Sequence, residues 1–303
     1  MPTASQRNNP HTAPALQQFP IHLELEVAFP DTLPKRGRIM QMLKINGVTL
    51  HYADEGDPDG APLVFANALG TDFRLWDAVL THLPKGLRII RYDKRGHGLT
   101  DAPDAPYFMG DLVADVAGLL DALAIKDVLF VGLSIGGMIA QGLAAERPDL
   151  VRAMVLSNTA AKIGTPQIWD ERFAAVRKGG IEALEMGTIS RWFSYYFHNN
   201  RTDELAGWSN MLCRTTVEGY IGCSEAISGT DLHDSTMRLT LPTLGIAGSE
   251  DGSTPPDMVR ETVALIEGSE FRLMRGVGHL PCVEDPETFA EILTGFMKAT
   301  NHV

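Results

Sequence analysis

The stretch VGLSIGG at residues 131–137 decides the fold of this chain. It follows a short apolar run and precedes a helical pattern at residues 138–147. A Gly-x-Ser-x-Gly turn between a buried strand and a helix holds its serine in a strained backbone conformation, and its glycines remove side chains that would collide there. The pattern predicts that Ser134 stands above a sheet as a nucleophile, where the helix N-terminus stabilises developing negative charge. The alternative is a glycine-rich turn with an incidental serine.

Short apolar runs rich in β-branched residues lie on both sides of this turn. In these runs the apolar residues follow one another directly instead of alternating with polar residues. This pattern is typical of strands buried on both faces of a parallel sheet. Residues 110–123 between two of them place their apolar side chains on one helical face. We therefore predict an α/β fold with a mostly parallel, doubly wound sheet. The runs are Leu63–Phe65, Arg88–Ile90, Val128–Val131, Ala153–Leu156, Thr243–Ala247 and Phe271–Met274.

The remaining segments suggest how the chain is divided. Residues 1–41 are proline-rich, with only residues 21–27 alternating like a strand, and we interpret them as an N-terminal extension. An Asn-Gly turn at 46–47 predicts a hairpin that opens the core. The alternation of strand-like apolar runs with helical segments stops after residue 158. The helix-rich region that follows holds three of the four tryptophans. We expect an α/β core at 42–159 and 239–303, with a helical cap at 160–238.

A serine hydroxyl is a weak nucleophile near neutral pH and needs a base oriented by an acid. Two later strand ends supply both, in GSEDGSTPP at 248–256 and GVGHLP at 276–281. We predict His279 as the base and Asp251 as the acid, and Glu250 is the neighbouring alternative to Asp251. Alone, His279 would be an ordinary loop histidine and Asp251 a turn or capping residue. Their occurrence together after Ser134 favours a catalytic triad.

The tetrahedral oxyanion of acyl transfer needs two backbone N–H donors. The residue after the nucleophile, Ile135, normally supplies one. The second comes from a loop after an earlier strand, and NALGTD at 67–72 follows the run 63–66. We choose Leu69 as this donor, although the same residues also suit an ordinary strand-end turn.

Composition limits the partners and the location of the protein. The net charge is −12, from 26 Lys and Arg against 38 Asp and Glu, so we expect neither a nucleic acid nor a membrane partner. The three cysteines have no metal-ligand spacing and indicate reduced thiols, which favours a cytoplasmic protein. No metal or organic cofactor is implied. A homo-oligomer is possible, and the sequence leaves the oligomeric state open.

Residues 42–300 resemble the α/β-hydrolase superfamily, and within it the 3-oxoadipate enol-lactonases. Part of the resemblance lies in the core and part in the expected cap. The features that carry it are YDKRGHG at 92–98, NALGTD at 67–72, GLSIGGM at 132–138, SNTAAKIG at 157–164, RWF at 191–193 and GYIGC at 219–223.

The resemblance implies hydrolysis of 3-oxoadipate enol-lactone to 3-oxoadipate, in the β-ketoadipate pathway of aromatic catabolism. The same triad would also serve a general carboxylesterase, a perhydrolase or a C–C bond hydrolase, because fold alone does not decide the substrate. A ligand receptor that retains the pocket without turnover is a further alternative. An aspartate at position 134, which dehalogenases and epoxide hydrolases would need, is absent.

The substrate of such an enzyme is a small lactone with a free carboxylate, which a cation beneath the cap would bind. Arg191 and Trp192 are the candidate substrate-binding residues. Adjacent residues on a helix point about 100° apart, so the sequence favours Trp192 over Arg191 as the side chain that faces the pocket. Lys162 and Arg214 are alternative cations, and Trp192 and Arg191 also suit a cap core residue and a surface charge.

Overall fold

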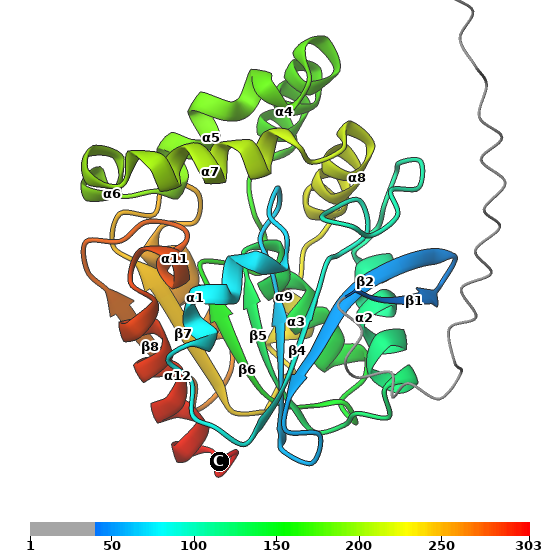
Figure 1. Cartoon of the computed structure of the whole chain (residues 1–303), viewed down its shortest axis with the longest axis vertical. Coiled ribbons are helices and arrows are strands. Elements are labelled where there is room, and N and C mark those ends of the chain that lie inside the picture. The colour runs from blue at the N-terminus through cyan, green and yellow to red at the C-terminus, as the bar shows by residue number, and fades with distance from the viewer. Residues whose placement is uncertain (1–39) are drawn as a thin grey trace, which may run out of the picture. The chain divides into compact units, whose positions relative to one another are not determined.

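The computed structural model describes residues 40–303 (Figure 1). The predicted extension at 1–41, with its strand-like residues 21–27, lies outside these residues except for its last two positions. In the described part of the chain, no helix combines the length and apolar character that a membrane span requires.

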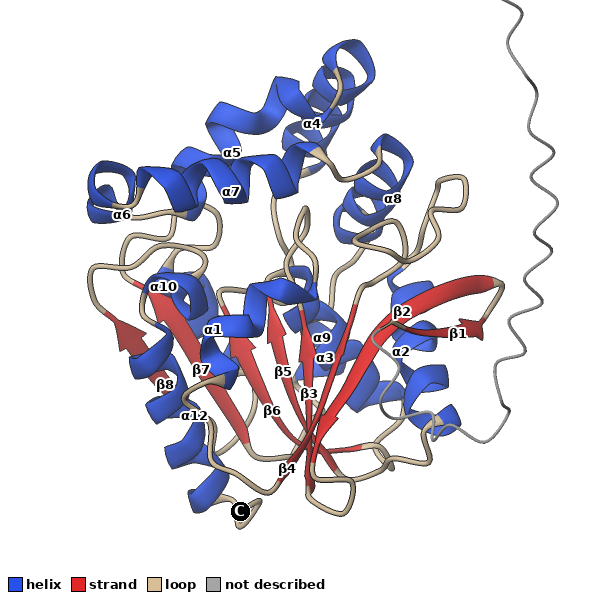
Figure 2. Ribbon diagram, in the orientation of Figure 1, coloured by secondary structure: helices blue, strands red, loops and turns tan. Residues whose placement is uncertain are grey.

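One sheet of eight strands runs through residues 40–303, in the order β1-β2-β4-β3-β5-β6-β7-β8 (Figure 2). The hairpin strand β2 pairs antiparallel with β1 and β4, and all other neighbours are parallel. The predicted doubly wound α/β fold is therefore confirmed. The strands are β1 (Gln41–Ile45), β2 (Val48–Gly56), β3 (Ala61–Ala66), β4 (Leu87–Tyr92), β5 (Val128–Leu133), β6 (Val151–Ser157), β7 (Thr243–Gly248) and β8 (Glu270–Met274).

The Asn-Gly turn forms the hairpin that the sequence predicts. Asn46 and Gly47 both have positive φ, at 49° and 84°, as a two-residue turn matched to the twist of its strands requires. The first strand begins at Gln41, one residue before the expected start of the core. Gln41 pairs with Tyr52 of β2, and its side-chain oxygen accepts a hydrogen bond of 2.7 Å from the Asp54 N–H, which also ties the strand start to β2.

Two pairs of helices cover the sheet. Helix α2 packs on α3, and α1 packs on α12, and in Figure 2 the two pairs lie on opposite faces of the sheet. The central strands between them are mostly buried, and β5 is buried along its whole length. The core helices are η1 (Phe73–Trp76), α1 (Asp77–Leu80), α2 (Met109–Ala122), α3 (Ile135–Glu146), α10 (Pro256–Ala264), α11 (Pro281–Glu284) and α12 (Pro286–Ala299).

Only helices lie between β6 and β7, and in Figure 1 the larger ones, α4 to α8, lie beyond the carboxyl ends of the strands. The last of them, α9, packs on α3 instead, and the Thr236 hydroxyl donates a hydrogen bond of 2.8 Å to Gln141. The helices are α4 (Pro166–Gly179), η2 (Ile181–Leu184), α5 (Glu185–Trp192), α6 (Tyr195–Asn200), α7 (Thr202–Cys213), α8 (Val217–Ser228) and α9 (His233–Thr236). We call α4 to α8 the inserted helices.

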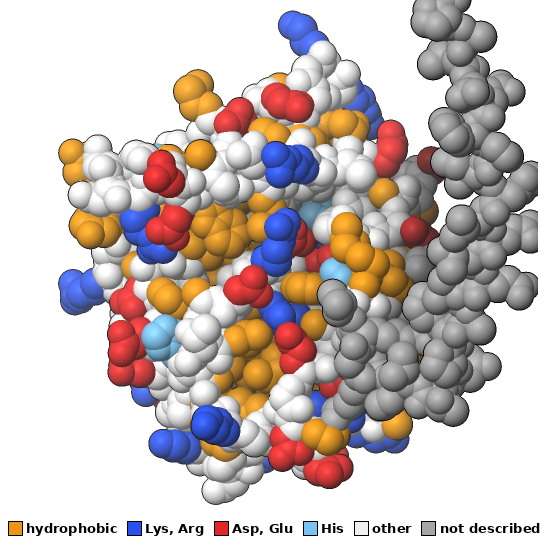
Figure 3. All heavy atoms as spheres, in the orientation of Figure 1, with side chains coloured by type: hydrophobic (Ala, Val, Ile, Leu, Met, Phe, Trp, Pro, Cys, Tyr) orange, Lys and Arg blue, Asp and Glu red, His pale blue; other side chains and the backbone are white. Residues whose placement is uncertain are grey.

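Charged side chains of both signs are interspersed on the face of the molecule in Figure 3, and apolar side chains show between them. Several acidic and basic residues on the surface are paired, such as Arg147 with Asp121 and Asp149.

Helix α8 is held to the loop after β4 by direct backbone contact between two glycines. A Cβ added at Gly219 would lie 2.1 Å from the Gly96 carbonyl oxygen, and one added at Gly96 would lie 2.2 Å from the Gly219 Cα. Gly96 also has a φ of 74°, which disfavours any side chain there. The closeness of the two elements therefore depends on the absence of both side chains.

Gly219→Ala is expected to lower the free energy of unfolding by about 1–3 kcal/mol, because the methyl group forces α8 away from the loop. The control is Gly207→Ala on α7, where an added Cβ meets no atom within 4 Å. That substitution should leave stability unchanged or raise it by up to about 1 kcal/mol, from helix propensity alone. Urea unfolding of both variants measures the difference. Equal effects would show that the glycine contact does not hold α8.

Candidate active site

Ser134 forms the turn between β5 and α3, with φ 59° and ψ −119°. A positive φ at a residue other than glycine is strained and persists only where the surrounding structure enforces it. A Cβ at Gly132 would lie 2.1 Å from the Gly136 oxygen, and a Cβ at Gly136 would lie 2.2 Å from the Ala66 oxygen. Only glycine fits at both positions, so the turn holds the start of α3 against the end of β3.

The predicted base and acid are in direct contact. His279 follows β8 and Asp251 follows β7, and the distance from His279 Nδ1 to Asp251 Oδ2 is 2.9 Å. Both side chains are almost fully buried. With Nδ1 bound to the carboxylate, Nε2 is the ring nitrogen left to receive a proton from a nucleophile.

The Asp251 carboxylate accepts hydrogen bonds on both oxygens. The N–H groups of Ser253 and Thr254 donate to Oδ1 at 2.7 and 3.0 Å, and the Asn158 amide and the Thr254 hydroxyl donate to Oδ2 at 2.9 and 2.8 Å. Burial works to raise the pKa of Asp251, but His279 and these donors outweigh it and hold the pKa below its ordinary value. The acid is therefore ionised near neutral pH.

Sequence reasoning missed the roles of Asn158 and Thr254. Asn158 directly follows β6 with a φ of 46°, and its amide also lies 3.3 Å from the Gly278 oxygen in the histidine loop. An asparagine directly after a buried strand is a signal for a left-handed residue at the strand end. Its partner Asp251 lies on another strand, so the sequence alone did not show the contact.

Glu250, the alternative acid, lies elsewhere. Its carboxylate accepts the Tyr195 N–H at 2.9 Å, at the start of α6, and its side chain is exposed. The structure thus places Asp251, and not Glu250, against His279.

The N–H groups of Leu69 and Ile135 have no hydrogen-bond acceptor among residues 40–303, although both residues are buried. Ile135 is the first residue of α3, where an N–H has no partner inside the helix. The next amide along the loop, that of Gly70, donates to His97 Nε2 at 2.9 Å and is therefore occupied. Two unpartnered donors next to a nucleophile suit an oxyanion hole.

A cavity of about 460 Å³ contains Ser134, Leu69 and His279. Residues of α4, α5 and α8 form much of its wall. Together with Leu184 of η2 and Ile163, which precedes α4, these wall residues are Ile163, Ile168, Trp169, Glu171, Arg172, Leu184, Thr188, Arg191, Trp192, Tyr220 and Ile227. The volume suits a small molecule.

Arg191 and Trp192, the two candidate substrate-binding residues, both line this cavity, although the sequence favoured Trp192 over Arg191. Both lie in the last turn of α5, and side chains as long as these can reach one cavity from positions about 100° apart on a helix. Arg172 of α4 lies in the same wall and was not predicted. Its spacing of three residues from Trp169 puts both on one helical face, but this local signal does not show which cavity the face lines.

The two alternative cations lie outside this cavity. Lys162 forms an ion pair with Asp231 at 3.1 Å. Arg214 lines a separate cavity of about 580 Å³, which Thr71 and Asp72 also line and which contains neither Ser134 nor His279.

Neither cation in the wall has a carboxylate partner among the described residues. Arg191 is 3.4 Å from the Thr188 hydroxyl, and Arg172 lies over the Trp169 ring, 5.3 Å from its centroid. Burial, and then the charge of Arg172, lower the pKa of Arg191 from its ordinary value, which still leaves it charged. Glu171 in the same wall is exposed and accepts from the Gln167 amide at 3.1 Å. This part of the cavity can therefore bind an anion.

The end of α5 is joined to the loops that carry the base and the acid. The Trp192 carbonyl accepts the His279 N–H at 2.8 Å, and the Arg191 carbonyl accepts the Gly252 N–H at 3.1 Å. These backbone bonds set the position of the cavity wall relative to the His279–Asp251 pair.

Known proteins match this chain along most of its length. Among curated proteins, it is 33% identical over 267 residues to 3-oxoadipate enol-lactonase 2 of Acinetobacter baylyi, covering 86% of this chain and 97% of that one. It is 27% identical to a non-heme chloroperoxidase of Streptomyces lividans, covering 84% and 98%. Among solved structures, the enol-lactonase of Burkholderia xenovorans aligns with a TM-score of 0.82 at 34% identity, covering 85% and 99%.

The family model described as "Alpha/beta hydrolase family" matches residues 63–292. The match spans the sheet from β3 onward, the serine turn, the inserted helices and the histidine loop. This confirms the family that the sequence motifs indicated: the chain belongs to the alpha/beta hydrolases.

Proposed function

We propose that this chain is a serine hydrolase that opens a small anionic lactone, namely 3-oxoadipate enol-lactone to 3-oxoadipate. The observation that carries the proposal is the pair of unpaired guanidiniums, Arg172 and Arg191, in the cavity that also contains Ser134 and His279. A neutral ester would not need them, whereas the enol-lactone has a free carboxylate. The similarity to relatives named enol-lactonases supports the same substrate.

In the proposed mechanism, Ser134 Oγ attacks the lactone carbonyl as His279 takes its proton, and Asp251 stabilises the resulting imidazolium. The N–H groups of Leu69 and Ile135 donate to the oxyanion. The ring C–O bond then breaks, and the His279 imidazolium gives its proton to the enolate oxygen, which restores the neutral base. The enol arm, which is still attached to the acyl group, becomes the ketone. An acyl-enzyme on Ser134 remains, and a water molecule activated by His279 hydrolyses it to release the diacid.

The charged arm of the substrate would lie against Arg172 and Arg191. Each guanidinium repels the other, so a carboxylate between them removes that repulsion as well as gaining hydrogen bonds. Trp192, which is buried in the same wall, supplies an apolar surface for the ring. The function therefore needs a cationic and an apolar wall together, and α4 and α5 provide both.

Ser134→Ala and His279→Ala should each lower kcat for the enol-lactone by at least about 10⁴-fold, because each removes one member of a nucleophilic unit. The loss of enol-lactone absorbance measures the rate, and circular dichroism checks the fold. A Ser134→Ala protein that kept near-parental turnover would rule out the proposed nucleophile. Wild-type protein that hydrolyses p-nitrophenyl esters but not the lactone would instead leave a general esterase.

Asp251→Asn should lower kcat by about 10⁴-fold, because the amide favours the wrong histidine tautomer and cannot stabilise the imidazolium. The matched control is Glu250→Gln, which changes the adjacent carboxylate but affects only a bond at the start of α6. We expect it to retain most of the activity in the same assay. A larger loss at Glu250 than at Asp251 would transfer the acid role to Glu250.

Arg191→Met and Arg172→Met should each raise KM for the enol-lactone by about 10- to 100-fold, as expected for losing a hydrogen bond to a charged group. Hydrolysis of an uncharged p-nitrophenyl ester should change little. Arg214→Met, in the separate cavity, serves as the control and should affect neither substrate. Equal losses on the charged and the uncharged substrate would identify the two arginines as structural.

A further inference from the structure

The Ala68–Leu69 peptide group connects a buried lysine to the expected oxyanion hole. Its N–H, that of Leu69, has no acceptor among residues 40–303. Its carbonyl oxygen, that of Ala68, accepts a hydrogen bond of 2.6 Å from Lys94 Nζ. In a trans peptide the C=O and N–H point in opposite directions. The lysine and the oxyanion therefore lie at the two ends of one amide dipole.

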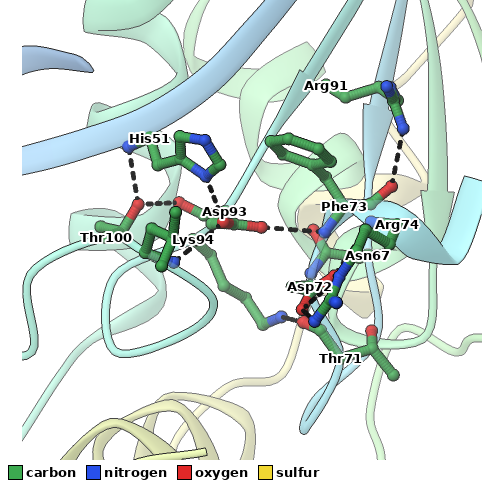
Figure 4. Close-up of polar contacts among 11 residues, drawn as sticks. His51, Asn67, Thr71, Asp72, Phe73, Arg74, Arg91, Asp93, Lys94 and Thr100 are labelled. Atoms are coloured by element: carbon green, nitrogen blue, oxygen red, sulfur yellow. Dashed lines mark hydrogen bonds and ion pairs between the residues drawn. The ribbon is translucent and has the colours of Figure 1, made fainter. Parts of the chain in front are cut away.

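Lys94 reaches the loop because β3 and β4 are parallel neighbours, so the segments after both strands meet at one edge of the sheet. In Figure 4 its side chain extends to the loop that carries Asn67 and Thr71, where it also lies 3.3 Å from the Thr71 carbonyl oxygen. Lys94 is only 2% exposed and forms no ion pair with any residue of the described chain. A buried ammonium without a carboxylate partner is costly, so it is poorly explained by stability.

The loop does not depend on Lys94 for its hydrogen bonds. The Ala68 carbonyl also accepts from the Thr71 hydroxyl at 3.0 Å and from the Thr71 N–H at 3.3 Å. The Thr71 carbonyl also accepts from the Asn67 amide. The Gly70 N–H is held separately by His97, whose burial, with the charge of Lys94, keeps its pKa far below the ordinary value and its ring neutral.

We propose that Lys94 is a positioning residue of the oxyanion hole, which orients and polarises the Ala68–Leu69 peptide so that Leu69 N–H donates more strongly to the oxyanion. A charged donor on the carbonyl oxygen shifts electron density toward that oxygen and makes the N–H of the same amide a stronger donor. The effect is largest when the oxyanion carries full charge. Lys94 thus lowers the barrier of acyl transfer without touching the substrate.

Lys94 also makes the stabilisation of the oxyanion depend on pH. Burial lowers the pKa of Lys94 to about 8, although the charges of Asp93 and Asp72 act in the opposite direction. Of the other groups that face it, His97 is neutral, and burial holds the pKa of the Cys223 thiol at about 12, so it is uncharged as well. As pH rises through about 8 the ammonium loses its charge, and the stabilisation of the oxyanion weakens.

The proposal rests on the proposed serine hydrolase but not on the lactone, so p-nitrophenyl butyrate is the substrate of the test. Lys94→Met, which keeps an unbranched side chain one atom shorter, should lower kcat by about 10- to 100-fold, less than the loss of a whole oxyanion donor. KM should stay within about twofold, since ground-state binding is not involved. Inhibition by butylboronic acid, which forms a tetrahedral adduct on the serine, should weaken by the same factor as kcat. The control is Lys298→Met at an exposed position on α12, which should change none of these values.

Thermal unfolding separates this role from a structural one. Lys94→Met should unfold at the wild-type temperature or above it, because an uncompensated buried charge is removed. The kcat of the wild type should fall as pH rises through about 8, and the profile of Lys94→Met should lack that step. The wild-type profile tests the proposal even if the variant does not fold.

Three results would overturn the proposal: wild-type kcat in Lys94→Met, a loss of kcat that accompanies a lower unfolding temperature, or a wild-type profile that stays flat above pH 8. Ser134→Ala separates the two hypotheses. If it hydrolyses the ester as fast as the wild type, the serine mechanism itself is wrong. If it is inactive while Lys94→Met is fully active, only the role of Lys94 is wrong.

Discussion

The rest of the site depends on one close approach of two backbones, where Gly136 of α3 meets the Ala66 carbonyl of β3 with no room for a side chain. This contact holds the strained turn at Ser134 in place. It also brings the first amide of α3 next to the loop that continues β3, which carries Leu69. The proposed nucleophile and the two proposed amide donors, which come from different elements, are thus brought together by a constraint on glycine, and not by contacts among these groups themselves.

Much of the fold was predictable because its signals are local. The Asn46-Gly47 turn, the continuous apolar runs and the serine turn each report on a few neighbouring residues, and all of them reappear in the structure. The start of β1 at Gln41 and the position of Arg172 could not be read in the same way. Each depends on contacts with a segment distant in sequence, Asp54 for the first and the rest of the cavity wall for the second.

The site contrasts with the rest of the molecule in charge. The chain as a whole carries −12, yet the cavity beside Ser134 has two arginines that no carboxylate of the described residues neutralises. On the surface, ion pairs between exposed opposite charges need little desolvation and contribute little to stability. In the half-buried wall, Arg191 faces a second cation instead, which raises the free energy of the empty cavity. The repulsion between the two arginines lowers the stability of the protein at the position where a bound anion would offset it.

The backbone bonds from the end of α5 to the base and acid loops have a geometric consequence. Because the Trp192 carbonyl accepts the His279 N–H, and the Arg191 carbonyl accepts the Gly252 N–H, the backbone of Arg191 is tied to the loops of His279 and Asp251. Under the proposed function, the distance between the charged anchor and the reacting carbonyl would then be set by the protein. A molecule whose acidic arm is one methylene longer or shorter would place its carbonyl away from the nucleophile when its anion is bound. Chain length, and not only charge, would be selected.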